Sequence, residues 1–103
     1  MITAITKFKL SNPVTLEEAK NIFLSTAPKY RDVPGLFSKC YVLFDNGHAV
    51  GGIYLWNSRA DAEKIYTESW KAYVKEKYGS EAEITYLDTP VVVDNISGEI
   101  LSS

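Results

Sequence analysis

The chain has 103 residues, of which 46% are hydrophobic and 23% charged, a balance typical of one globular domain. The formal net charge is −2 and no cluster of Lys and Arg is present, which argues against nucleic acid as a partner. No apolar stretch reaches the roughly 20 residues of a membrane-spanning helix, and the start lacks the layout of a signal peptide. A single cysteine, Cys40, and a single histidine, His48, exclude a disulfide framework and a structural zinc site. We therefore expect a cytoplasmic protein without a membrane partner.

Alternating apolar residues predict a strand over the first ten residues, with these side chains on one face: Ile2, Ala4, Thr6, Phe8 and Leu10. Thr15 and Glu18 have the spacing of a capping box, which predicts that a helix begins there. Apolar residues follow at helical spacing and predict its buried face: Leu16, Ala19, Phe23, Ala27 and Tyr30. Pro28 is expected to end or kink this helix.

A β-hairpin is predicted from residues 36–44 and 49–56, because Asn46-Gly47 between two β-rich segments is a strong turn signal. With these two residues as the loop, Asp45 pairs with His48. The same register places five side chains on one face of the hairpin: Phe37, Lys39, Tyr41, Tyr54 and Trp56. It places Cys40 among aliphatic residues on the other face. A slip of one residue would exchange the faces of one strand, so this grouping depends on the turn.

Ser58 and Asp61 predict the N-terminus of a second helix that runs to about residue 66. After a break at residues 67–69, a further helical segment is expected from Trp70 to Tyr78, with Gly79 as the residue that ends it. Residues 83–93 predict the last strand, which Pro90 interrupts, so that this strand or its end lies at a sheet edge. The expected domain covers residues 1–94, and residues 95–103 are expected to form a polar C-terminal tail.

The element order β-α-β-β-α-β is typical of an α+β, ferredoxin-like fold, in which a four-stranded antiparallel sheet carries its helices on one face. The strand formed by residues 36–44 lies at an edge of such a sheet. The helix-free face of this sheet is too apolar to face water. We therefore expect a homodimer that packs sheet against sheet, which would close a barrel between the subunits.

Three motifs between residues 33 and 56 carry a family resemblance: Val33-Pro34-Gly35-Leu36, Lys39-x-Tyr41 and Gly51-Gly52-Ile53-Tyr54-Leu55-Trp56. In these motifs the chain resembles the YdhR-type monooxygenases. They belong to the dimeric α+β barrel superfamily, which includes the antibiotic-biosynthesis monooxygenases. The resemblance implies a homodimer with a pocket between sheet and helices in each subunit. It also implies oxygenation of a small aromatic or phenolic compound without metal or flavin, the substrate itself being the reductant.

Such chemistry needs an apolar pocket, a proton acceptor and hydrogen-bond donors for a developing oxyanion. Aromatic and polar side chains from the hairpin and the second helix would meet these needs if both groups face inward, and Gly52 would leave space among them. The candidate catalytic residues are Tyr54, Trp70 and Lys39. The candidate residues for binding a small hydrophobic or aromatic ligand are Tyr41, Trp56, Tyr66, Tyr73 and Phe23. No metal site and no cofactor are expected.

Each of these residues also has a purely structural interpretation. The aromatic side chains could simply form the core, and Lys39 could protect an edge strand from unwanted pairing. The alternative for Lys39 is a cation in the pocket that stabilises an enolate or binds a carboxylate. His48 is the only imidazole, but its place at the hairpin turn favours an exposed residue, which also argues against the haem ligation known in some relatives. Cys40 is interpreted as an inert core residue.

Three functions remain open from the sequence. The first is a cofactor-independent monooxygenase acting on a small aromatic or phenolic compound. The second is a non-catalytic or stress-related dimer that binds a small hydrophobic ligand in the same pocket, which the lack of an Asp, Glu or convincing His in the pocket favours slightly. The third is an isomerase or lyase of the same fold. In the first case a tyrosinate, or a substrate that ionises by itself, would replace a conventional base.

Overall fold

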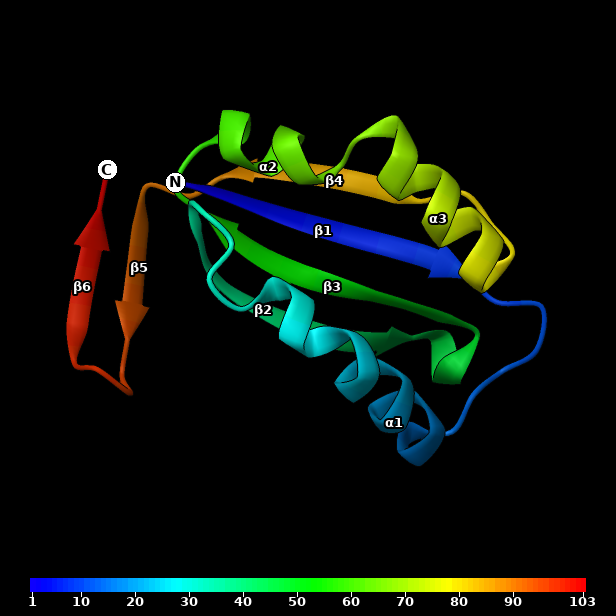
Figure 1. The fold of residues 1–103 in the computed structure, drawn as a ribbon. Helices are drawn as coiled ribbons and strands as arrows, with labels where there is room; N and C mark the ends of the chain where they lie inside the picture. The colour runs from blue at the N-terminus through cyan, green and yellow to red at the C-terminus, as the bar shows by residue number, and fades with distance from the viewer.

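The computed structural model describes residues 1–103 as an antiparallel sheet with helices on one face (Figure 1). The elements follow the chain as β1 (Ile2–Lys9), α1 (Leu16–Thr26), β2 (Leu36–Phe44), β3 (Ala49–Trp56), α2 (Arg59–Ile65), α3 (Glu68–Tyr78), β4 (Glu83–Asp88), β5 (Val91–Asp94) and β6 (Glu99–Ser102). The main sheet has the order β2-β3-β1-β4, with antiparallel neighbours throughout. This confirms the α+β, ferredoxin-like prediction and the place of β2 at an edge.

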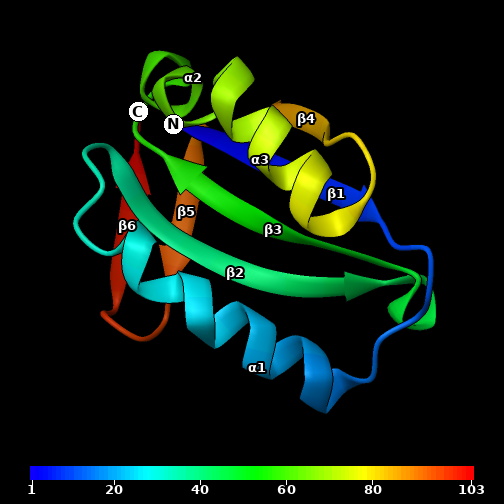
Figure 2. The ribbon, with the colours of Figure 1, turned by 45° about the vertical axis from the view of Figure 1, so that its right-hand side comes forward.

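The core lies between the sheet and the helices, and α1 along β2 and α3 along β1 cover the same sheet face (Figure 2). The predicted grouping of side chains on β1 is confirmed, and the structure shows that Ala4, Thr6 and Phe8 face the core. One apolar cluster joins β3 to α2 and consists of Ala4, Tyr54, Trp56, Ala62 and Tyr66. The other joins α1 to α3 and consists of Phe8, Ala19, Phe23, Val50 and Val74. Both clusters border the space between the two helices.

The helix ends follow the sequence signals. The Thr15 hydroxyl accepts a hydrogen bond from the Glu18 amide at 3.1 Å, and the Glu18 carboxylate accepts one from the Thr15 amide at 3.1 Å. Leu16 is a correction, because it is 77% exposed rather than part of the buried face. It is the first residue of α1 and points to the outer groove beside Leu24 and Leu43 rather than to the core.

The break after α2 is also confirmed. The Thr67 hydroxyl caps α3 by accepting from the Trp70 amide at 3.2 Å, so α3 begins two residues earlier than expected. Gly79 ends α3 with a φ of +84°, in the left-handed region that favours glycine.

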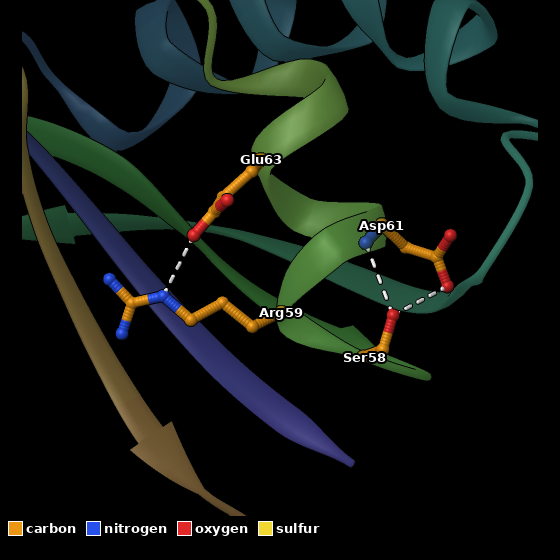
Figure 3. A network of polar contacts seen from close by, with 4 residues as sticks. All are labelled: Ser58, Arg59, Asp61 and Glu63. Carbon is orange, nitrogen blue, oxygen red and sulfur yellow. Dashed lines mark hydrogen bonds and ion pairs between the residues drawn. The ribbon is translucent and has the colours of Figure 1, made fainter.

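The N-terminus of α2 is fixed by side-chain contacts (Figure 3). The Ser58 hydroxyl accepts from the Asp61 amide at 3.1 Å and donates to the Asp61 carboxylate at 3.0 Å. Arg59 forms an ion pair with Glu63 at 3.0 Å. Gly35 packs against this end of the helix. At its φ of +80°, a Cβ would lie 2.4 Å from the Asp61 carboxyl group, so the turn before β2 requires glycine there.

The β2–β3 hairpin has the predicted register over its central part, since Lys39 pairs with Tyr54 and Tyr41 pairs with Gly52. The turn prediction is confirmed in part. Asn46 and Gly47 are the central residues of the turn, since the His48 amide donates to the Asp45 carbonyl at 3.2 Å. The strand ladder, however, ends at Phe44 and Ala49, so residues 45–48 form a four-residue connection with a 3₁₀ turn. A two-residue loop at 46–47 and a four-residue loop at 45–48 have the same midpoint, so the residues that pair across the two strands are the same in both.

The far end of the hairpin contains a second difference. Leu36, not Phe37, pairs with Trp56, because the register shifts between Leu36 and Ser38. A bulge of this kind leaves one residue out of the ladder. Phe37 is 52% exposed and does not line the cavity that Lys39 enters.

The last predicted strand is divided at Thr89-Pro90. β4 pairs with β1 in the main sheet, whereas β5 pairs with β6 in a separate hairpin that extends beyond the end of the sheet (Figure 1). Proline lacks the amide that a sheet ladder needs, which explains the break. β6 therefore lies within the segment that the sequence analysis assigns to a tail.

The helix-free face of the sheet carries apolar side chains in contact with solvent. Ile53 on β3 is 40% exposed, and Leu87 on β4 is 47% exposed. Cys40 is exposed on the same side of β2, so its assignment to the core is wrong for the single chain. None of the helices has both the length and the apolar character needed to cross a membrane.

Candidate functional site

A cavity lies between α1, α3 and the inner face of the sheet. Its free volume is about 50 Å³, which is room for little more than ordered water. Six of the eight predicted site residues line it, namely Phe23, Lys39, Tyr41, Tyr54, Trp70 and Tyr73. The structure therefore brings the hairpin face and the helical residues together around one space.

The other two predicted residues lie away from this cavity. Trp56 is fully buried, and its indole N–H donates to the Tyr66 hydroxyl at 3.1 Å. Tyr66 is 5% exposed and follows the last residue of α2. The break between α2 and α3 separates Tyr66 from Trp70 and Tyr73, which lie on α3. Tyr66 still touches the site indirectly, since its ring lies 5.0 Å from that of Trp70.

Lys39 occupies the most unusual position in the site. Its Nζ lies 3.3 Å from the ring centre of Tyr30, 3.9 Å from that of Tyr41 and 4.6 Å from that of Tyr54. Gly52 makes room for it as expected, because a Cβ there would lie 3.1 Å from Lys39 Cε and 2.9 Å from the Tyr54 ring. We call Tyr30, Tyr41 and Tyr54 the tyrosine cage.

The protonation of Lys39 is balanced between two opposing effects. Burial disfavours the ammonium form and lowers the pKa of Lys39 to about 7. The negative faces of the cage rings favour the ammonium form. No carboxylate pairs with this side chain. Lys39 is therefore able to hold or release a proton close to neutral pH.

The buried tyrosines behave differently. Burial raises the pKa of Tyr54 and of Tyr66 far above the ordinary value, and it raises the pKa of Tyr78 to about 12. Burial also raises the pKa of Tyr41, although a hydrogen bond with Thr26 at 2.8 Å opposes this effect. These hydroxyl groups stay protonated at neutral pH, so they can donate hydrogen bonds but cannot act as tyrosinate bases.

Tyr73 stands at the solvent side of the cavity and is 47% exposed. Its ring centre lies 5.2 Å from the Lys29 ammonium and 5.9 Å from the Lys77 ammonium. Desolvation alone would raise the pKa of Tyr73, but the positive charges of Lys77 and Lys29 outweigh it and lower the pKa. We call Lys29, Tyr73 and Lys77 the mouth of the cavity.

Sequence reasoning missed several lining residues. Tyr30 was assigned to the buried face of α1, but it lies in the 3₁₀ turn after that helix, where its hydroxyl accepts from the Trp70 indole at 3.3 Å. Lys29 and Lys77 carried no signal, because lysines near helix C-termini are ordinary. Their convergence on one opening depends on how α1 and α3 cross the sheet.

Metal-binding side chains do not gather anywhere in the chain, since no three His, Cys, Asp or Glu residues form a group that could hold an ion. His48 is exposed at the hairpin connection, away from the cavity, in agreement with its interpretation as a turn residue. The cavity itself contains no carboxylate and no imidazole. Lys39 is thus the one cavity side chain whose pKa is placed near 7.

Known structures share this arrangement of sheet and helices. A monooxygenase from the gene ActVA-Orf6 of Streptomyces coelicolor, in complex with nanaomycin D, is 18% identical, with 85% of this chain and 86% of that chain covered and a TM-score of 0.62. A candidate antibiotic biosynthesis monooxygenase from Deinococcus radiodurans is 11% identical over 91% and 97% of the two chains, with a TM-score of 0.64. The chain shares its ferredoxin-like α+β fold with these proteins.

A third similar structure is SnoaB, a cofactor-independent oxygenase from Streptomyces nogalater, which is 12% identical over 85% of this chain and 91% of that chain, with a TM-score of 0.59. No family model and no curated protein sequence matches the chain. At these identities the likeness establishes the fold, and the narrower resemblance to the YdhR-type proteins stays a prediction.

Proposed function

We propose that this protein is a cofactor-independent monooxygenase that acts on a small aromatic or phenolic compound in the cavity between α1, α3 and the sheet. The observation that carries the proposal is Lys39, a lysine without a carboxylate partner inside an aromatic-lined cavity. This chemistry needs a proton acceptor, and the sequence alone did not identify one. The fold shared with two proteins named as oxygenases supports the same reaction class.

The reaction begins with loss of a proton from the substrate. The resulting carbanion, conjugated with a phenolate, reduces dioxygen and forms a peroxide at the same carbon. Loss of water then leaves a carbonyl group, so a CH₂ group and O₂ give C=O and H₂O. The electrons come from the substrate, and one oxygen atom leaves as water.

The cavity residues have separate roles in this scheme. The neutral amine of Lys39 accepts the first proton, and the ammonium ion that results stabilises the neighbouring oxyanion. The Tyr54 hydroxyl acts as a hydrogen-bond donor, and the Trp70 indole N–H does so by exchanging the Tyr30 hydroxyl for the substrate oxygen. Phe23, Tyr41 and Tyr73 contact the aromatic part of the substrate.

The free volume of the cavity requires a movement before an aromatic compound enters, because small-molecule sites usually have about 300 Å³ or more. A groove of about 400 Å³ lies on the outer side of α1 and β2, and Phe23 and Tyr41 line both spaces. Their stacked rings, with centres 4.8 Å apart, form the boundary. Rotation of this pair would join the groove to the cavity.

A non-catalytic protein that binds a small hydrophobic ligand is the second candidate. The lack of any carboxylate or imidazole in the cavity favours it, since these are the usual general bases of enzymes. Either function is proposed for a homodimer in which the helix-free faces of two sheets pack together, as argued below for the whole molecule.

Oxygen consumption with phenols, naphthols and anthrone tests the enzyme. We expect uptake by the wild type, and a loss of about 10²-fold in kcat for Tyr54→Phe or Trp70→Phe, the usual effect of removing one oxyanion donor. Tyr86→Phe is the matched control, because Tyr86 lies on β4 outside the cavity. Binding of these compounds without any oxygen uptake would exclude the monooxygenase and support the second candidate.

A further inference from the structure

The charges around the cavity are all of one sign. Among its fifteen lining residues are Lys29, Lys39 and Lys77, and none is an Asp or Glu. None of these lysines takes part in the five ion pairs of the structure. The chain as a whole has a net charge of −2, so three lysines without carboxylate partners in one place are a local feature. Such a site attracts an anion.

We infer that the cavity selects aromatic anions, a carboxylate or a phenolate on a ring system, and that Lys39 supplies the counter-charge inside while Lys29 and Lys77 attract the anion at the mouth. This deepens the proposed function, because it names the substrate class of the same cavity. It also applies unchanged if the protein only binds its ligand.

The tyrosine cage explains why an anion is favoured at Lys39. The ammonium group is half-buried and is surrounded by Tyr30 from the 3₁₀ turn, Tyr41 from β2 and Tyr54 from β3, with no carboxylate among the lining residues. A buried cation without a counter-ion is costly, and a ligand anion removes that cost. The aromatic rings around it contact the apolar part of the same ligand.

The mouth contributes at longer range. Lys29, at the end of the α1 region, and Lys77, on α3, both approach Tyr73 and remain in water. Charges in such positions raise the local concentration of anions and the rate of association, and their effect falls with ionic strength. The interior site and the mouth are therefore expected to respond differently to salt.

Binding should also change the protonation of Lys39. The other ionisable groups that line the cavity are Lys29, Lys77 and five tyrosines, so no acid competes for the proton. Burial lowers the pKa of Lys39 to about 7, and an anion beside it would raise that pKa again. At pH 8 the free protein therefore holds mostly neutral amine. A bound carboxylate should bring close to one proton from solvent onto Lys39, whereas a phenol supplies that proton itself, which is the transfer assigned to the neutral amine above.

Isothermal titration of the full chain with 1-naphthoate and with its neutral isostere 1-naphthamide tests the inference. We expect naphthoate to bind about tenfold or more tightly, with this advantage lost in Lys39→Met and kept in Lys71→Met. Lys71 is the matched control, since it lies on α3 outside the cavity. Titration at pH 8 in two buffers of different ionisation enthalpy should show uptake of nearly one proton, absent in Lys39→Met.

A second variant, Lys29→Met with Lys77→Met, changes only exposed side chains and keeps the test valid if Lys39→Met fails to fold. It should slow association and weaken its salt dependence. Equal affinity for naphthoate and naphthamide would overturn the inference, as would an equal loss in Lys71→Met. These binding outcomes do not depend on turnover. Anion selectivity without oxygen uptake would contradict only the proposed monooxygenase activity. Oxygen uptake with neutral phenols but without anion selectivity would contradict only the inference about aromatic anions.

Discussion

Lys39 shows how one residue links stability and function in this protein. Its side chain reaches inward from an edge strand, where a lysine would ordinarily face water. The unfolded chain keeps the ordinary lysine pKa of 10.5, whereas burial lowers the pKa of Lys39 in the folded protein to about 7. Between these two values the unfolded state binds one proton more, so the free energy of unfolding rises with pH across this window. The destabilisation that comes from burying the Lys39 ammonium is fully present below pH 7.

Replacement Lys39→Met should therefore stabilise the fold. The gain in the free energy of unfolding is expected to be on the order of a few kcal/mol at pH 6 and to shrink toward zero as the pH approaches 10.5. Urea unfolding at several pH values measures it. Lys71→Met, which removes an exposed lysine, should show no such trend. An effect of Lys39→Met that does not change with pH would contradict the lowered pKa of the buried Lys39 side chain.

Among the elements, α1 depends most clearly on a local signal. Its hydrophobic contacts with the sheet come from Ala19 and Phe23, while Leu16 and Leu24 remain exposed. The reciprocal hydrogen bonds of Thr15 and Glu18 therefore make an identifiable contribution to where the helix begins. Since Phe23 lines the cavity, the same cap also positions one wall of the site.

Removal of this cap by Thr15→Ala should lower the free energy of unfolding by about 1 kcal/mol, because the Glu18 amide loses its acceptor. Thr15→Ser keeps the hydroxyl and should retain most of the stability. Chemical denaturation of the three proteins measures the difference. If serine and alanine prove equally destabilising, the hydroxyl does not contribute in the way described.

The β2–β3 hairpin illustrates what local signals leave open. Its register was predictable from the position of the turn, yet the loop has four residues rather than two. The bulge that exposes Phe37 had no signal in the strand itself. It lies where β2 begins, beside the Gly35 turn that packs on the end of α2, so it depends on a contact with a later segment of the chain.

At the scale of the whole molecule, the single chain leaves much apolar surface uncovered. Ile53 and Leu87 face solvent from the middle and the edge of the helix-free sheet face, and Val93 and Ile100 of the β5–β6 hairpin are 64% and 72% exposed. Uncovered apolar surface of this extent marks an interaction site in soluble proteins. We propose that a second copy covers the sheet face, in a closed twofold arrangement.

Light scattering at micromolar concentration should give twice the chain mass of 11.5 kDa. Ile53→Lys places a charge at the centre of the proposed interface and should yield a folded monomer, because the position is partly exposed in the single chain. Leu24→Lys, at a 59% exposed position on α1, is the matched control and should remain dimeric. A monomeric wild type, or dissociation by Leu24→Lys instead, would contradict this interface.

Features that depend on neighbours along the chain were predictable before the structure was known. The periodicity of the strands, the caps at Thr15 and Ser58, the helix end at Gly79 and the central hairpin register all follow from residues a few positions apart. Together these signals were enough for the α+β fold and for gathering most of the site residues on one face.

Tertiary structure alone decided the chemistry of the site. Whether Lys39 lies in water or among tyrosines and whether Lys29 and Lys77 meet at one opening depend on how α1 and α3 cross the sheet. Whether Trp56 lines a cavity or is fully buried depends on the packing of α2 against β3. Desolvation and charge proximity act through space between segments far apart in sequence. For that reason the residue types were readable from the sequence, but the low pKa of Lys39 and the positive sign of the cavity were not.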